Sequence, residues 1–192
     1  MQKNAIVLLA EGFEEVEAIT PIDYLRRAGI AVTIAAVGNS GALSVKGARG
    51  ITVNADAALS GLIQQGRADA AAWDAVIIPG GIPGATNIAA SPEAGALITA
   101  MAAAGKLVCA ICASPALALA PLGLLSGRKF TCYPGMEEKV QDTSTWTDEC
   151  VAIDGNIITS RGAGTAGKFA IAIIGQLLTE AEGNKIAQAV LL

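Results

Sequence analysis

The sequence has no histidine among its 192 residues. Imidazole is the usual protein base near neutral pH and the commonest metal ligand, so its absence excludes mechanisms that need a histidine from within this chain. The four cysteines are too few for a disulfide-rich scaffold and too scattered for a zinc module. We therefore expect neither a bound metal nor another cofactor.

Charged residues are also scarce, at 16%, whereas hydrophobic residues make up 53% of the chain. This balance excludes an intrinsically disordered chain, which requires low hydrophobicity and high charge. Thirteen basic and seventeen acidic residues give a net charge of −4. A mildly acidic protein lacks the basic patches that phosphate binding needs, so we expect no dedicated nucleic-acid site.

Long apolar runs are absent as well. The first run, Ala5–Ala10, has six residues and is followed by four glutamates within seven positions. A signal peptide has a longer apolar core and a small-residue cleavage site. Later alanine-rich stretches are interrupted by Gly, Pro or charge before the roughly 20 residues that a membrane-spanning helix requires. We expect a cytoplasmic, reduced protein without a membrane partner.

Short apolar runs alternate with helix-like segments along the whole chain, without a linker or an internal repeat. The runs typical of buried strands are Ala5–Ala10, Ala31–Val37, Ala75–Ile78, Leu107–Ile111 and Ile157–Thr159. The helix-like segments are Val16–Ala28, the stretch that opens at Ser91-Pro92-Glu93, Pro115–Ala120 and Thr165–Leu178, and a small hairpin is expected from the glycine-punctuated region 38–50 to Ile51–Val53. This alternation predicts one α/β domain over residues 1–192, with a mostly parallel sheet between helices.

Cys112 is the strongest candidate for chemistry. It directly follows the buried run Leu107–Ile111 and precedes small residues and Pro115, which is the pattern of a nucleophile on a sharp turn between a strand and a helix. Helix N-terminal amides favour a thiolate, so we expect a pKa for Cys112 below that of a free cysteine. On local pattern alone, a buried structural cysteine remains an alternative.

Cys109 and Cys112 form a CxxC sequence, which raises a dithiol redox function as a second possibility. Cys109 lies inside the apolar run, and three residues of extended chain separate the two by about 10 Å. A disulfide needs Cα atoms closer than about 7 Å. The pattern therefore argues against a thioredoxin-like pair.

Glu17 differs from the other glutamates near the N-terminus because Val16, Ala18 and Ile19 surround it. A carboxyl group among apolar neighbours tends to stay protonated and can donate a hydrogen bond. A favourable interaction with the helix dipole explains two of the four glutamates in this cluster. Farther along the chain, Gly80-Gly81 follows a strand and permits close approach of the backbone to a ligand.

Four segments at the ends of strands form an ordered set: Leu9–Glu17, Pro79–Gly81, Ala110–Pro115 and Thr159–Thr165. Together with Pro21–Gly29 they resemble the ThiJ/PfpI (DJ-1) superfamily, in particular its YajL-like and Parkinsonism-associated deglycase branch. The resemblance covers nearly the whole chain. It implies a flavodoxin-like three-layer α/β/α sandwich that assembles as a homodimer.

The resemblance also assigns roles to individual residues. It implies that Cys112 is the nucleophilic, oxidisable cysteine and that Glu17 is a protonated carboxyl hydrogen-bonded to its sulfur. The backbone at Gly80, Gly81 and Ala113 matches the family's oxyanion pocket, with the N–H groups of Gly81 and Ala113 as the donors.

Arg27 and Arg49 match family arginines near the dimer interface and the pocket rim. The sequence departs from the family at Tyr133 on that rim, where many members carry a histidine just before a proline. A phenol is a poor base at neutral pH, which argues against the proteolysis and glutamine-amide hydrolysis of more distant relatives. Glu17 is then the only group left to carry protons.

Two functions from different classes fit these residues, and both come from the resemblance. The first is a cysteine-dependent enzyme, of deglycase or glyoxalase type, that acts on small reactive aldehydes such as glyoxal and methylglyoxal or on their protein and nucleotide adducts. The second is a redox sensor or chaperone for unfolded client proteins, in which Cys112 is oxidised to a sulfinate. An inert thiol in a structural domain is the third possibility.

Overall fold

The computed structural model describes residues 2–38, 41–140 and 143–192, so residues 39–40 of the predicted region 38–50 lie outside the described part. A seven-stranded sheet has the order β10-β11-β7-β6-β1-β2-β5. Its strands are β1 (Asn4–Leu9), β2 (Ala31–Ala36), β5 (Ala57–Ala58), β6 (Ala75–Ile78), β7 (Leu107–Ile111), β10 (Val151–Asp154) and β11 (Ile157–Ser160). All neighbours are parallel except β10 and β11.

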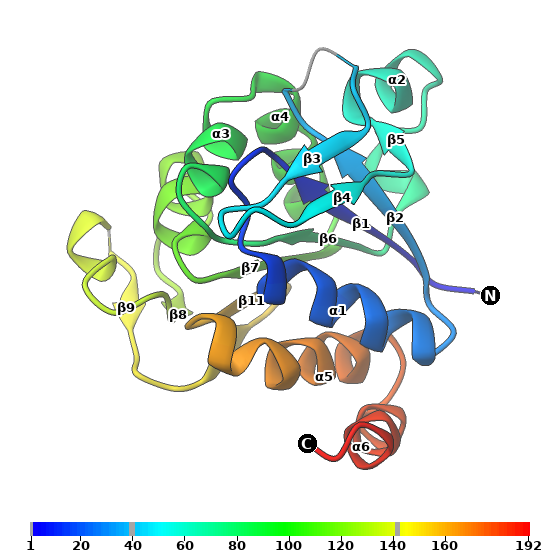
Figure 1. The fold of residues 1–192 in the computed structure, drawn as a ribbon. Helices are drawn as coiled ribbons and strands as arrows, with labels where there is room; N and C mark the ends of the chain where they lie inside the picture. Colours follow the sequence, from blue (N-terminus) through cyan, green and yellow to red (C-terminus); the bar gives the residue numbers. More distant parts are fainter. Residues whose placement is uncertain (1, 39–40, 141–142) are drawn as a thin grey trace.

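Helices cover both faces of this sheet (Figure 1). One face carries α1 (Glu15–Arg27) and α5 (Ala166–Leu177), and α6 (Glu180–Ala189) packs on α5. The other face carries α2 (Leu59–Gln64), α3 (Gly84–Ala89) and α4 (Pro92–Ala103). The predicted flavodoxin-like sandwich with a mostly parallel sheet is confirmed.

Two small two-stranded sheets lie outside the main sheet. The predicted hairpin is present as β3 (Ser44–Lys46) paired antiparallel with β4 (Thr52–Asn54). The second sheet pairs β8 (Lys129–Phe130) with β9 (Thr145–Trp146). Tyr133 lies in the segment that connects these two strands.

The first strand shows why a continuous apolar run marks the centre of the sheet. Ala5, Val7 and Leu9 point into the core shared with α1 and α5, whereas Ile6 and Leu8 point into the core shared with α2, α3 and α4. None of these side chains is exposed to solvent. Because side chains alternate along a strand, a strand that is covered on both faces needs apolar residues at every position.

Helix α1 begins one residue earlier than predicted and is capped by an acidic residue. The Glu17 N–H donates to the Glu14 carboxylate at 2.8 Å, which makes Glu14 the N-cap. Gly29 follows the helix with a φ of +78°, a conformation that favours glycine. Helix α4 begins as predicted, since the Ser91 hydroxyl accepts a hydrogen bond from the Ala94 N–H.

The helical segment predicted at Pro115–Ala120 is present, but its hydrogen-bond pattern differs from that of an α-helix. Pro115–Leu119 forms a single π-helical turn, and Ala120–Leu122 continues as a 3-10 turn. Pro121 has no N–H to extend the helix, and Gly123 then adopts a φ of +72° that ends it. Cys112 is therefore not followed by a regular α-helix.

The loop after β1 and the loop after β6 are joined by backbone hydrogen bonds. The Glu14 N–H donates to the Gly80 carbonyl at 3.0 Å, and the Gly84 N–H donates to the Gly12 carbonyl at 3.1 Å. At Gly84 a Cβ atom would lie 2.6 Å from the backbone of Phe13. Only glycine permits this approach, which brings the two loops against each other.

We predict opposite effects of alanine at two helical glycines. Gly84→Ala should lower the free energy of unfolding by about 1–3 kcal/mol, because the methyl group overpacks against rigid backbone. Gly95→Ala in α4 should raise it by about 0.5–1 kcal/mol, because its Cβ would meet only Leu122 at 3.6 Å and alanine favours the helix. Urea denaturation measures both. Equal effects would show that the contact between the loops does not constrain the fold.

Candidate functional site

The candidate site lies at the carboxyl ends of four neighbouring strands. Glu17 lies in α1 after β1, Gly80 follows β6, Cys112 follows β7, and Gly162 follows β11. In parallel α/β sheets these ends share one edge, where ligands usually bind. Segments that are far apart in the sequence are brought together there.

Cys112 occupies a strained turn. Its φ is +66°, in a region that residues with a side chain rarely adopt, at a cost of about 1–2 kcal/mol. Its N–H donates to the Ser160 carbonyl at 2.9 Å, and its own carbonyl accepts from the Tyr133 N–H at 2.8 Å. The Ser114 hydroxyl donates to the Pro79 carbonyl at 2.6 Å. These bonds hold the nucleophile elbow that the sequence predicts.

Glu17 lies against the thiol of Cys112 and is 1% exposed. Its Oε2 accepts a hydrogen bond from the Gly80 N–H at 2.9 Å, and the Ala163 N–H also donates to the carboxyl group. A Cβ atom at Gly80 would lie 2.5 Å from Cys112 Cβ and 2.6 Å from Glu17 Oε2. Glycine at position 80 is therefore a condition for contact between the carboxyl and the thiol.

The pKa of Glu17 is raised from 4.5 to about 7. Burial is the largest cause, because desolvation penalises the charged form, and the nearby charge of Glu14 adds to it. Hydrogen bonds from Cys112 and from the backbone of Gly80 and Ala163 act in the opposite direction. The expectation that Glu17 favours its protonated form is confirmed in direction, and near neutral pH both forms are populated.

The expectation that the pKa of Cys112 falls below the ordinary value is wrong. The pKa of the thiol is raised to about 12, and burial is the largest cause. The charge and the hydrogen bond of Glu17 also raise this pKa, and their effects outweigh those of the Gly81 and Ala113 N–H groups, which lower it. The physical reason is twofold. A single π-helical turn replaces the expected helix, and the closest ionisable group is a carboxyl. Cys112 therefore rests as a thiol and needs a base to become a nucleophile.

The backbone donors predicted for an oxyanion pocket lie beside Cys112. The N–H groups of Gly81 and Ala113 both point to the sulfur of Cys112. The Gly80 N–H has a different partner, the Glu17 carboxyl. Two N–H groups beside the sulfur can stabilise negative charge that develops on an atom bonded to it.

The remaining cysteines do not form a second redox or metal centre within the described residues. All four cysteines are free, and Cys109 is fully buried in β7, where burial raises its pKa strongly. Cys132 is also buried, and burial together with the charge of Glu137 raises its pKa to about 12. In the described ranges, no three potential metal ligands lie together. The argument against a Cys109–Cys112 disulfide agrees with this geometry.

Two of the predicted rim residues, Arg27 and Arg49, make their described polar contacts with acidic residues of α1. Arg27 is paired with Asp23 at 2.8 Å near the C-terminal end of α1, ten residues or about 15 Å beyond Glu17. Arg49 lies in the β3–β4 hairpin, where its N–H donates to Glu15 Oε1 at 2.7 Å. Tyr133 does lie beside the site.

Three residues with a part in the site were missed in the sequence analysis. Glu14 was interpreted only as a residue that favours the helix dipole, but its charge also raises the pKa of Glu17. Ala163 and Gly162 belong to the segment after the last parallel strand, Ala163 as a donor to Glu17. The position of that segment at a strand end was the only available signal, because backbone donors leave no mark in side-chain chemistry.

Comparison with known proteins identifies the family. The model of the DJ-1/PfpI family matches residues 3–176. The chain belongs to the DJ-1/PfpI family. Protein dj-1beta of Drosophila melanogaster is 37% identical over 192 residues, which is 100% of this chain and 98% of the relative. Glutathione-independent glyoxalase DJR-1.2 of Caenorhabditis elegans is 36% identical over 175 residues, or 90% of this chain and 88% of the relative.

Solved DJ-1 structures share the fold. Drosophila DJ-1beta superposes with a TM-score of 0.90 at 37% identity, covering 100% of this chain and 99% of the other. Oxidised Toxoplasma gondii DJ-1 superposes with a TM-score of 0.90 at 35% identity, covering 98% of each chain. The ThiJ/PfpI resemblance seen in the sequence is confirmed.

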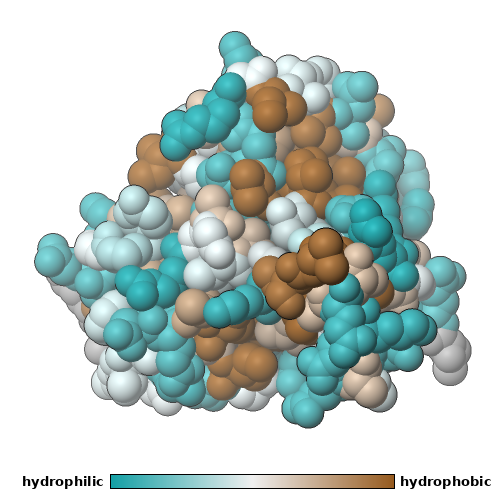
Figure 2. Space-filling model, turned by 60° about the horizontal axis from the view of Figure 1, so that its bottom comes forward, coloured by the Kyte–Doolittle hydropathy of each residue, from teal (hydrophilic) through white to brown (hydrophobic). Residues whose placement is uncertain are grey.

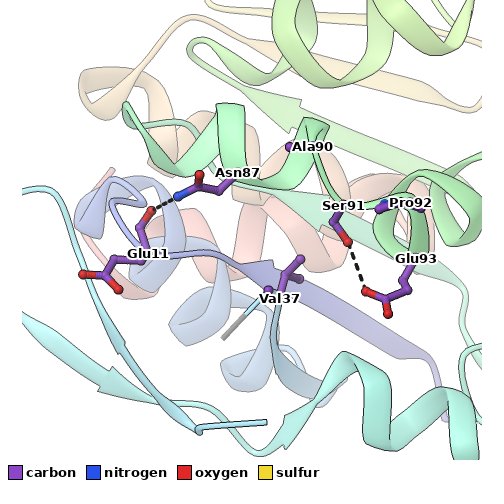
Figure 3. Close-up of a pocket in the computed structure, with 8 residues that line it drawn as sticks. Glu11, Val37, Asn87, Ala90, Ser91, Pro92 and Glu93 are labelled. Atoms are coloured by element: carbon purple, nitrogen blue, oxygen red, sulfur yellow. Dashed lines mark hydrogen bonds between the residues drawn. The ribbon is translucent and has the colours of Figure 1, made fainter. Parts of the chain in front are cut away.

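A separate hollow of about 450 Å³ lies at the neighbouring part of this sheet edge (Figure 3). Its lining comes from the ends of β1 and β2 and from the junction of α3 and α4, and it includes Glu11, Asn87, Ser91 and Glu93. The Asn87 side-chain N–H donates to the Glu11 carbonyl at 2.9 Å, and the Ser91 hydroxyl donates to Glu93 at 3.4 Å. Neither Cys112 nor Glu17 is among the residues that line this hollow.

We predict that Glu17 makes the protein less stable as the pH rises. Its pKa is about 7 when folded and 4.5 as a reference for the unfolded chain, so the folded state binds more protons between these values. Stability contributed by this group is then complete below pH 4.5 and falls by about 3 kcal/mol as the pH rises to 7. Denaturation across this range should show the decline in wild type and its absence in Glu17→Gln. The control Glu138→Gln, at an exposed position, should keep the wild-type decline, and a decline retained in Glu17→Gln would refute the assignment.

Proposed function

We propose that this protein is a cysteine-dependent enzyme that acts on glyoxal or methylglyoxal, or on their adducts, and protects against carbonyl and oxidative stress. The observation that carries the proposal is the contact of the Cys112 thiol with Glu17, whose pKa of about 7 suits proton transfer at neutral pH. The relative named a glutathione-independent glyoxalase supports the substrate class. Deglycase and glyoxalase activities both fit this site.

The geometry supports a mechanism in which Glu17 acts first as a base. The sulfur of Cys112 bonds to the aldehyde carbon, and the thiol proton passes to the Glu17 carboxylate. The carbonyl electrons move to oxygen, where the N–H groups of Gly81 and Ala113 stabilise the charge.

The later steps return the proton. With methylglyoxal, Glu17 first gives the thiol proton to the alkoxide oxygen. As a carboxylate it then moves a proton from the first carbon to the second, while the hydroxyl proton of the first carbon passes to the carbonyl oxygen of the second, and a lactoyl thioester results. Water cleaves the thioester, releases lactate and restores the thiol. With an amine adduct, the sulfur displaces the amine: the carbon–nitrogen bond breaks, the amine leaves with the proton that Glu17 took from the thiol, and the sulfur-bound hemithioacetal follows the same path to lactate.

A second function is favoured by the same donors. If peroxide oxidises Cys112, the N–H groups of Gly81 and Ala113 and a protonated Glu17 can all donate to sulfinate oxygens. An oxidised relative from Toxoplasma gondii has been solved. A redox sensor, or a chaperone for unfolded clients, is therefore the alternative to the enzyme.

We infer that the partner in solution is a second copy of this chain. On α1, Val16 and Ile19 are 48% and 39% exposed and lie one turn apart, and Ile51 of the neighbouring hairpin is 58% exposed. Figure 2 shows hydrophobic patches between polar residues on the side of the molecule that carries α1, α5 and α6.

We infer that residues 1–192 form one domain and that the protein works in a reducing, cytoplasmic environment. One main sheet spans residues 4–160, the family match continues to residue 176, and the four cysteines are free. Among the described residues, no helix is long and apolar enough to cross a membrane.

For the enzyme, we predict that Cys112→Ala abolishes turnover and that Glu17→Gln lowers it about 100-fold or more. Glu17→Gln should also lower the pKa of Cys112, because a charge that raises this pKa is removed. Release of lactate from methylglyoxal, or of free amine from an adduct, measures turnover, and thiolate absorbance against pH measures the pKa. Cys150→Ala, at an exposed cysteine outside the site, is the control. Full turnover in Glu17→Gln would exclude proton transfer by Glu17.

For the redox alternative, we predict that two equivalents of peroxide convert Cys112 from thiol to sulfinic acid and release two molecules of water. In a Cys150→Ala background, the intact mass should rise by two oxygens, and Cys112→Ala should prevent the rise. A loss of two hydrogens that dithiothreitol reverses would instead show a disulfide and contradict the geometry.

A further inference from the structure

Tyr133 is held beside the candidate site by its backbone. Its N–H donates to the carbonyl of Cys112 at 2.8 Å, directly at the strained turn. Its side chain is 53% exposed, so one side of the ring faces solvent. The mechanism above uses neither the ring nor the hydroxyl group of this residue.

The ring and the Glu17 carboxyl both lie close to one point. This point is the position that a Cβ atom would take on Gly162, 3.5 Å from Cδ2 and 4.0 Å from Cε2 of Tyr133 and 3.7 Å from Oε1 of Glu17. Gly162 has an extended backbone with a φ of 166°, so its lack of a side chain opens a gap rather than relieving strain. Tyr133 lies on the solvent side of this gap, because Glu17 is almost fully buried.

The other groups described around Glu17 are two ionisable side chains and two backbone N–H groups. Glu14 faces it from the N-cap of its own helix, the Cys112 thiol faces it from the end of β7, and backbone N–H groups face it from Gly80 and Ala163. Among the described residues, Glu14 and Cys112 are the titratable groups that act on Glu17. On the side toward Gly162, by contrast, the group between the carboxyl and water is an aromatic ring and not a polar group.

We propose that the ring of Tyr133 is a positioning element that covers the gap at Gly162 and keeps water away from Oε1 of Glu17. Water at this oxygen would stabilise the carboxylate, so removal of the ring makes the carboxyl more acidic. The hydroxyl group is dispensable for this role because it is the ring carbons that approach Gly162. The kinetic consequence rests on the proposed function, but the effect on the protonation of Glu17 does not.

The test follows the protonation of Glu17 directly, by infrared or carbon NMR spectroscopy of labelled carboxyl groups, with Glu17→Gln used to assign the signal. Tyr133→Ala should shift the titration of Glu17 down by about one pH unit, whereas Tyr133→Phe should leave it at the wild-type value. Adding Gly162→Ala to Tyr133→Ala should recover part of the shift, because the methyl group occupies the same gap in ordinary contact with the carboxyl.

Trp146→Ala is the matched control, since it removes an exposed aromatic side chain from β9, beside the strand that leads to Tyr133. It should leave the titration unchanged. An equal shift in Tyr133→Phe would assign the effect to the hydroxyl group and overturn the proposal, as would no shift in Tyr133→Ala or an equal shift in Trp146→Ala. If Tyr133→Ala does not fold, Tyr133→Val takes its place and should shift the titration in the same direction, and no shift in that variant would overturn the proposal.

Kinetics then separate this proposal from the proposed enzyme. If Glu17 is the base, the acid limb of the pH profile for turnover should move to lower pH in Tyr133→Ala by the same amount as the spectroscopic titration. A wild-type protein without turnover would contradict the enzyme while the titration still decides the role of Tyr133. A titration that moves without the acid limb would support the ring as a cover and exclude Glu17 as the base.

Discussion

Contact between the Glu17 carboxyl and the Cys112 thiol is the constraint on which the rest of the site depends. It exists only because position 80 has no side chain: a Cβ atom there would overlap both partners. Burial raises the pKa of Glu17 to about 7, against the opposing hydrogen bonds from Cys112 and from the backbone. The charge and the hydrogen bond of Glu17 in turn add to the burial that raises the pKa of Cys112. The contact thus couples the proton affinities of the two groups.

The surrounding loops are organised so that this approach is possible. Glu14 caps α1 through its side chain and binds the Gly80 carbonyl through its N–H, so it connects the helix that carries Glu17 to the loop after β6. Gly84 lets the same loop lie on the backbone of Phe13. The strained turn at Cys112 is held from the neighbouring strand and from the segment of Tyr133. The strained backbone of Cys112 and the buried carboxyl of Glu17 are therefore adjacent, and hydrogen bonds from the adjoining loops compensate for their cost in stability.

Most of the fold could be predicted because burial on both faces leaves a direct record in sequence. Ala5–Ala10 and Leu107–Ile111 contain no polar residue, and they form parts of central parallel strands. The helical segment after Cys112 was predicted in its place but not in its type, because an apolar pattern does not record that Pro121 lacks the N–H that an α-helix needs. The effect of this one proline outweighed the apolar pattern around it.

The site was predictable where side chains carry the chemistry and less so where the backbone does. Cys112 and Glu17 stand out by residue type and by their neighbours. The donor at Ala163 and the gap at Gly162 do not, because any residue supplies an N–H and a glycine often marks only a turn. The pKa of Cys112 was predicted in the wrong direction because the effect of a helix N-terminus was assumed, whereas burial beside a carboxyl dominates.

Because the chain has no histidine, the proposed chemistry depends on how far the Glu17 carboxyl is shielded from water. A histidine would titrate near neutral pH without help, whereas a carboxyl reaches that range only when water is kept from it. Every group that excludes water from Glu17 then affects reactivity, including residues that never contact a substrate. Burial that is too complete would prevent ionisation of Glu17 and leave the thiol without a base, whereas free access of water would make the carboxyl too weak a base to take the thiol proton. A buried carboxyl that only the ring of Tyr133 separates from solvent at Gly162 fits the proposed function, in which Glu17 exchanges its proton during each turnover.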